Sequence, residues 1–187
     1  MSRHIQLEDL ESMAPAIDSV WAAFLKANCI VSLVSHSHAS DVSMWTVFPD
    51  EEGPIAIRWE NTLPPEAMRK YRDKNKRTDF AACAIALLVM PEMTGYKAIE
   101  QSATGDRIDY YLSRDGTDPD LIFNDTALME VSGIHNETLL NTVTRRIGVK
   151  RKRYQTPIKG KLFSTSDLPA YICVVEFSAP KAKAVLA

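Results

Sequence analysis

RIDYYLS, at Arg107–Ser113, and ALMEVSGI, at Ala127–Ile134, are the two stretches that decide the fold of this 187-residue chain. Both are rich in β-branched and aromatic residues, which favour strands. Tyr96–Gln101, just before them, reads as a further short strand, and a turn at 103–106 joins it to the next one. Because short connections join antiparallel neighbours, the three stretches predict an antiparallel meander.

A helical segment precedes the meander. The apolar run Phe80–Met90 predicts a helix, because it is too long for a typical strand. Thr78 and Asp79 are candidate N-caps for this helix, and Pro91 is the expected stop.

A second helix and a last strand complete the expected core. The helix begins after Asn136, a candidate N-cap, and its apolar residues Leu140, Val143 and Ile147 share one face. YICVVEF, at Tyr171–Phe177, is a nearly continuous apolar run, as in a strand buried on both faces. A strand that is reached through a helix lies parallel to the preceding strand by a right-handed crossover. The core is therefore expected to be helix, three-strand meander, helix and strand, with a mixed sheet.

Residues 1–62 read as an N-terminal extension packed on that core. Apolar residues recur at helical spacing over Leu7–Leu25. Met44–Phe48 and Ile55–Trp59 are rich in Trp, Val and Ile and read as a hairpin. We therefore expect an α/β protein with its core over 63–187 and a helical and hairpin extension before it.

The overall charge conceals two basic segments. The chain is 45% hydrophobic and 25% charged, with a formal net charge of −2, which excludes collagen-like, coiled-coil and fully disordered classes. However, residues 138–166 hold eight cations and no acid, and residues 69–77 hold six cations and one acid. Two basic segments on an acidic body indicate a negatively charged partner.

Two acids in the expected meander form the strongest candidate for chemistry. Asp109 lies in the middle strand and Glu130 in the next strand. If the strands are neighbours, both carboxylates reach one edge of the sheet, where a divalent cation relieves their repulsion. Mg²⁺ suits such a pair, because it takes oxygen ligands and keeps several waters. A metal held in this way can clamp a phosphate and activate water. If the carboxylates do not meet, they are ordinary surface acids.

This order of elements, with these acids, resembles the PD-(D/E)XK nuclease superfamily over residues 78–178. That family has a helix–strand–strand–strand–helix–strand core, a first acid on the second strand and a (D/E)-x-K tripeptide on the third. The resemblance implies a restriction-endonuclease-like core in which Asp109 and Glu130 bind Mg²⁺ (or Mn²⁺). It also implies that the backbone carbonyl of Val131 is the middle ligand. Glu100 is an additional candidate ligand, since its strand neighbours that of Asp109.

Ser132 stands where the family has its lysine. In the family that lysine orients the attacking water and stabilises negative charge on the phosphate. Three explanations stay open for the serine. Lys150 or Lys152 of the following helix fills the same space, or the enzyme works with metal alone, or the domain only binds.

The basic run after the third strand would flank such a site. Cations there attract a phosphate backbone without regard to its sequence, and an aromatic ring can stack on an exposed base. Contact with an acidic protein surface is the alternative. The expected nucleic-acid-binding residues are Arg145, Arg146, Lys150, Arg151, Lys152, Arg153 and Tyr154.

The remaining patterns point to no other chemistry. Cys29, Cys83 and Cys173 lie far apart in apolar runs, which indicates buried free thiols rather than a disulfide framework or a zinc site. His36 and His38 read as part of a polar loop. The polar N-terminus does not resemble a signal peptide, and no apolar run is long enough to span a bilayer. We therefore expect a cytoplasmic protein that makes no membrane contact.

The sequence thus predicts a metal-dependent nuclease acting on DNA phosphodiester bonds. It would take its specificity from a protein partner or a homo-oligomer, as a subunit of a bacterial defence or mobile-element system would. The rival is a catalytically inactive subunit of the same fold that binds nucleic acid or a partner protein through its basic helix. A protein-interaction component without a nucleic-acid role is the third alternative.

Overall fold

A single mixed β-sheet organises the protein. The computed structural model describes residues 3–61, 63–103, 107–114, 125–155 and 168–187. The strands run in the order β1-β3-β2-β8-β7-β6-β5-β4 across the sheet. They are β1 (Arg3–Gln6), β2 (Val42–Phe48), β3 (Glu51–Arg58), β4 (Lys97–Gln101), β5 (Tyr110–Ser113), β6 (Thr126–Ile134), β7 (Ala170–Glu176) and β8 (Lys181–Leu186).

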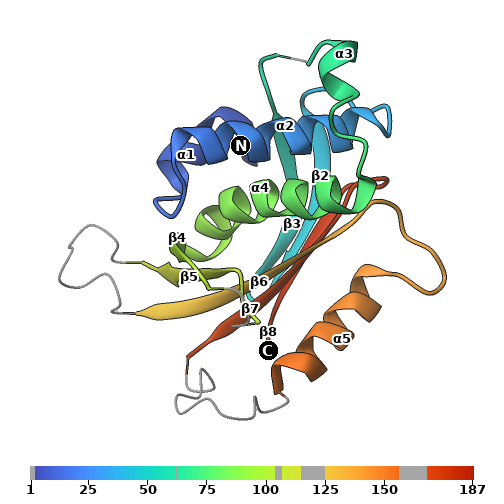
Figure 1. Cartoon of the computed structure of the whole chain (residues 1–187). Coiled ribbons are helices and arrows are strands. Elements are labelled where there is room, and N and C mark those ends of the chain that lie inside the picture. The colour runs from blue at the N-terminus through green and yellow to red at the C-terminus, as the bar shows by residue number, and fades with distance from the viewer. Residues whose placement is uncertain (1–2, 62, 104–106, 115–124, 156–167) are drawn as a thin grey trace.

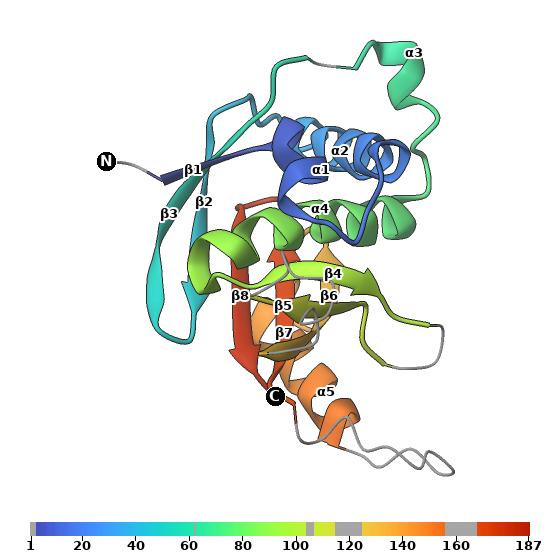
Figure 2. The ribbon, with the colours of Figure 1, turned by 90° about the vertical axis from the view of Figure 1, so that its left-hand side faces the viewer.

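Helices cover both faces of this sheet. Figures 1 and 2 show α1, α2 and α4 on one face, with α4 next to the strands, and α5 on the other face. The helical elements are the 3₁₀ turn η1 (Leu7–Asp9), α1 (Leu10–Met13), α2 (Ser19–Val34), α3 (Pro65–Met68), α4 (Lys74–Thr94) and α5 (Val143–Gln155).

The predicted order of core elements is confirmed. Strands β4, β5 and β6 pair as an antiparallel meander, and β6 pairs with β7 in parallel, with α5 between them in the chain. The protein is therefore an α/β protein with a mixed sheet, as expected. The N-terminal hairpin of β2 and β3 is also present, and it joins the same sheet because β2 pairs in parallel with β8.

The apolar run before the meander is buried because α4 has neighbours on opposite sides. From Ala81 to Met90 almost every α4 side chain is buried, within one core cluster shared with the sheet and α2. A helix that is apolar all round is typical of such a central position. On the other face of the sheet a smaller cluster joins Val143 and Ile147 of α5 to Ile134, Ile172 and Val174.

The sequence-based predictions of where the two core helices begin were wrong. The first helix begins at Lys74 rather than after Thr78 or Asp79, because the Asp73 carboxylate accepts from the Lys76 N–H and caps it there. It also continues through Pro91 to Thr94.

The second helix begins at Val143 rather than after Asn136. Thr138 and Asn141 first close a tight turn by exchanging two backbone hydrogen bonds. Glu137 then caps the helix from outside it, since its Oε1 accepts from the Val143 N–H at 2.7 Å.

A close contact between α4 and β6 fixes the position of this helix against the sheet. A Cβ atom built on Gly133 would lie 2.2 Å from the carbonyl oxygen of Thr78, far inside van der Waals contact. Only glycine lets the helix backbone approach the strand so closely.

In the described part of the chain no helix is long and apolar enough to cross a membrane.

Candidate active site

The site forms where β6 extends past the start of its neighbour β5. Asp109 was expected within the middle strand, but it lies just before β5, which begins at Tyr110. The pairing of β5 with β6 starts at Tyr110 and Met129, and the Asp109 N–H donates to the Met129 carbonyl at 2.8 Å. Alternate residues of a strand direct their backbone groups to the same side, and Leu128 donates towards Pro169, just before β7. The N–H groups of Val131 and Gly133 therefore point away from β7, along an edge that β5 does not reach.

Carboxylates take the place of a strand along this edge. Asp109 Oδ2 accepts from the Val131 N–H at 2.6 Å, and Asp79 Oδ1 accepts from the Gly133 N–H at 3.0 Å. Since a strand residue directs its C=O to the same side as its N–H, the carbonyl of Val131 also lies along this edge. Asp79 was expected as a helix cap, so its position beside β6 was not predicted.

Lys150 reaches Glu130 across the α5 face of the sheet. Its Nζ forms an ion pair with Glu130 Oε1, and both side chains are largely buried. Lys152 lies on an exposed position of the same helix. Lys150 and Lys152 were predicted to fill the space of the lysine that Ser132 replaces; the structure pairs Lys150 with Glu130, and it is Arg146 that contacts Ser132.

A second cation lies beside Ser132. Arg146 Nη1 donates to Ser132 Oγ at 3.0 Å, and its Nε and Nη2 both donate to Asn141 Oδ1, at 3.2 and 2.8 Å. The guanidinium group is thus held in one orientation. Arg146 was expected to bind nucleic acid, and helical spacing now explains its place, because Arg146 and Lys150 are one turn apart.

The two acids line one cavity of about 440 Å³. Its wall includes Asp109 and Glu130, the arginines Arg107 and Arg153, and the aromatic side chains Trp21 and Phe80. Arg107 Nη1 also donates to the Arg153 carbonyl at 2.9 Å, which joins the segment before β5 to the end of α5. Acidic, basic and aromatic side chains from α2, α4, β6 and α5 therefore meet in one place.

The pKa of Asp109 is raised from 3.8 to about 6. Burial is the main cause, because it disfavours the charged form, and the nearby charge of Glu130 adds to it. The hydrogen bond from Val131 and the charge of Lys150 act in the opposite direction without cancelling the effect. Asp109 is therefore a carboxylate that the fold holds at a cost, which is typical of functional sites.

This raised pKa predicts how stability changes with pH. The folded carboxyl binds its proton more tightly than the unfolded one, so the free energy of unfolding falls as the pH rises from about 4 to about 6. We expect the free energy of unfolding of Asp109→Asn, measured with urea at pH 7.5 in EDTA, to be higher than that of the wild type by roughly 2–3 kcal/mol. The gain should vanish near pH 4. A variant that follows the wild-type pH profile would show that Asp109 is not strained.

The small set of oxygen donors at this site fits a magnesium ion. Mg²⁺ is commonly held by one or two carboxylates and completes its shell with waters and substrate phosphate. Asp109, Glu130 and the Val131 carbonyl meet that description. In the described ranges no three or more His, Cys, Asp or Glu side chains form a group that could hold a metal by themselves.

Of the other predicted site residues, Arg153 lines this cavity. Glu100 lies on β4, opposite Tyr111, and its role as a ligand stays a prediction. Arg145, Arg151 and Arg153 are exposed on α5. Tyr154 is half-buried and packs against the small cluster of Ile108, Leu128 and Ala170. The end of the basic run, with Lys159 and Lys161, lies outside the described residues.

The histidines of the expected polar loop meet a third histidine. His36 Nε2 lies 3.2 Å from His135 Nδ1, and His38 Nε2 lies 3.0 Å from the carbonyl oxygen of Phe177. Burial lowers the pKa of His36, and burial together with the charge of His36 lowers that of His135 to about 4. At neutral pH this contact is therefore made by uncharged rings.

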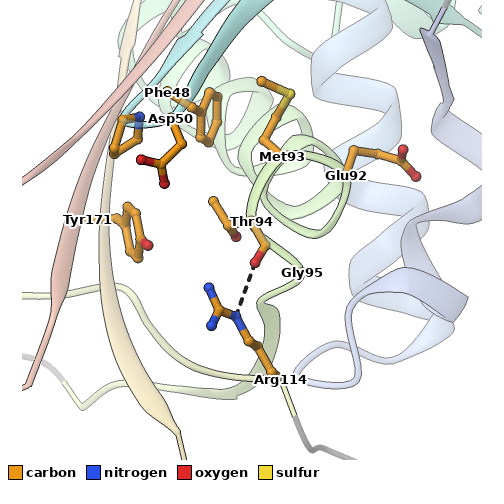
Figure 3. Close-up of a pocket in the computed structure, with 9 residues that line it drawn as sticks. Phe48, Asp50, Glu92, Met93, Thr94, Gly95, Arg114 and Tyr171 are labelled. Atoms are coloured by element: carbon orange, nitrogen blue, oxygen red, sulfur yellow. Dashed lines mark hydrogen bonds between the residues drawn. The ribbon is translucent and has the colours of Figure 1, made fainter.

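A second cavity, of about 280 Å³, lies at the other end of α4. In Figure 3, Asp50 and Tyr171 lie on one side of it and Thr94 and Arg114 on the other. Arg114 Nε donates to the Thr94 carbonyl at 3.1 Å, and its guanidinium stacks 4.2 Å from the centre of the Tyr96 ring. These contacts explain the arginine as a structural link between β5 and the end of α4.

Comparisons of the chain with protein-family models, with curated proteins and with solved structures found no match. The geometry of the 440 Å³ cavity therefore carries the functional argument.

Proposed function

We propose that this protein is a metal-dependent phosphodiester hydrolase that acts on DNA, with a restriction-endonuclease-like core of the PD-(D/E)XK type. One observation carries the proposal: Asp109 and Glu130, 21 residues apart in the chain, line one cavity, and Lys150 reaches Glu130 from the next helix. The element order around them, from α4 to β7, is the order on which the resemblance to that superfamily rests.

In this proposal Asp109, Glu130 and the Val131 carbonyl hold Mg²⁺ (or Mn²⁺). Bound there, the metal would polarise the phosphate and lower the pKa of a bound water. The protein supplies the rest. Lys150 and Arg146 bring positive charge to the α5 side of β6, where the family has its tripeptide lysine. These cations can orient the attacking water and stabilise the charge that develops on the phosphate.

The exposed cations of α5 would hold the DNA backbone beside the cavity. Arg145, Arg151, Lys152 and Arg153 are exposed on this helix, and Arg153 also lines the cavity. Their attraction to phosphate does not depend on base sequence, so specificity would come from a protein partner. Such a division of roles is expected in a subunit of a defence or mobile-element system.

The ion pair itself supports a second candidate function. Glu130 is already neutralised by Lys150 in a largely buried contact, which competes with a metal for the carboxylate. If that contact never opens, the domain is an inactive subunit of the same fold that binds nucleic acid or a protein partner through α5.

One assay separates the two functions. Supercoiled plasmid and single-stranded DNA are incubated with the purified protein in Mg²⁺, Mn²⁺ or EDTA. The hydrolase should cut in either metal and not in EDTA. Intact DNA in both metals, together with binding that weakens steeply with salt, would replace the hydrolase by the binding subunit. Intact DNA with no binding would reject both functions.

A further inference from the structure

Aromatic rings line the same cavity as the two acids. Trp21 of α2 and Phe80 of α4 both form part of its wall. Their ring centroids are 5.7 Å apart and their ring planes are nearly perpendicular. Phe24 stacks on Trp21 with centroids 5.1 Å apart, and its centroid lies 4.9 Å from that of Phe80. The Trp21 ring is therefore held in place by two neighbouring rings, and we call Trp21 and Phe80 the aromatic wall.

The two side chains of the aromatic wall are not fully buried in the core. Ala81 and Ala82, the next residues of α4, are completely buried, whereas Trp21 and Phe80 are only half-buried. Val20 beside Trp21 is 76% exposed. Partly exposed apolar rings that line a cavity are a common sign of a ligand with an apolar face.

The charged residues of the cavity show what the rest of that ligand is. Arg107 and Arg153 supply positive charge close to Asp109 and Glu130. A phosphate group is attracted by the arginines and bridged to the carboxylates by a divalent cation. A ligand that combines a flat aromatic face with a phosphate is a nucleotide, and 440 Å³ lies within the usual range for a small-ligand pocket.

We propose that the aromatic wall stacks on an unpaired base of single-stranded DNA whose phosphate lies against the two acids. This inference rests on the proposed hydrolase and names its substrate. In a duplex both faces of each base are covered by neighbouring bases, so a paired base has no free face for Trp21. An unpaired base offers its face to an aromatic ring whatever its sequence.

Fluorescence of Trp21 tests the stacking without any cleavage. Trp45 is exposed and Trp59 is buried, so Trp45→Phe leaves Trp21 as the accessible indole. In EDTA and low salt, single-stranded oligo-dT should quench this protein strongly, while a Trp21→Phe/Trp45→Phe protein should show little quenching. A duplex of the same length should quench neither. Equal quenching of the two proteins, or quenching of Trp21 by duplex, would overturn the inference.

Affinity provides the second measurement. Trp21→Leu removes the ring and should weaken single-stranded binding roughly tenfold or more, while Trp21→Phe keeps an aromatic face and should retain most of it. Duplex binding should be unchanged in both. Thermal unfolding of each variant checks the fold. A loss of equal size for duplex and single strands would also overturn the inference.

The outcomes keep the two proposals apart. Cleavage that needs the acids but not Trp21 would reject the stacking and leave the hydrolase. Stacking that needs Trp21 in a protein that cuts nothing would reject the hydrolase and leave a single-strand-binding domain.

Discussion

Glu130→Gln and Asp109→Asn should each lower DNA cleavage by roughly 10²–10³-fold or more, with the protein still folded. Both side chains line the 440 Å³ cavity, and each amide keeps the shape of the carboxyl while it loses the negative charge. A neutral amide is a poor ligand for Mg²⁺, so the variant would lose the metal ion that neutralises the phosphate. Initial rates of plasmid nicking at saturating Mg²⁺ measure the effect.

Glu52→Gln is the matched control, because Glu52 is an exposed strand glutamate on β3, several strands away from β6. It should cut at the wild-type rate. Glu100→Gln adds a further comparison: a loss as large as that of Glu130→Gln would bring Glu100 into the ligand set. Wild-type cleavage by Glu130→Gln would contradict the site as proposed.

Gly133→Ala should lower the free energy of unfolding by about 3 kcal/mol or more. The new Cβ would lie 2.2 Å from the oxygen and 2.6 Å from the carbon of the Thr78 carbonyl group. These are backbone atoms of α4, so the helix itself would have to move away from β6. Overpacking of this kind typically costs about 1–3 kcal/mol and more when backbone must shift. Urea unfolding followed by far-UV circular dichroism measures it.

Gly148→Ala is the matched control, since Gly148 lies within α5 and no atom outside its own helical turn lies within 4 Å of the place that a Cβ would take. Alanine is the better helix former, so this variant should gain roughly 0.5–1 kcal/mol. The two substitutions are therefore expected to differ in sign. A Gly133→Ala protein as stable as the wild type would mean that α4 does not pack against β6 as described.

The core of the fold could be predicted from sequence because its signals are local. The α4 run is apolar throughout, and the strands of the meander are rich in β-branched and aromatic residues. The edge strand β1 has only four residues, too few to show a period. In β8 the buried residues are two alanines that alternate with lysines, a pattern that carries little hydrophobic signal. Both strands were missed.

The positions of the candidate site residues could be predicted in part, while their roles stay predictions. Asp109 and Glu130 could be paired from strand order alone, because neighbouring strands fix which residues meet. The choice between Lys150 and Lys152 depends on how α5 is rotated, and the wrong start at Asn136 left that rotation undefined. Trp21 and Asp79 reach the site through the packing of α2 and α4, which no local pattern reports.

The carboxylates along β6 have a consequence for aggregation. An unpaired strand edge in the middle of a sheet is a template on which another chain can add a strand. Asp109 and Asp79 occupy the N–H groups of Val131 and Gly133 that such a strand would use, and their charges repel an incoming backbone carbonyl. Asp109, which we propose for phosphate chemistry, therefore also blocks the addition of a further strand at this edge.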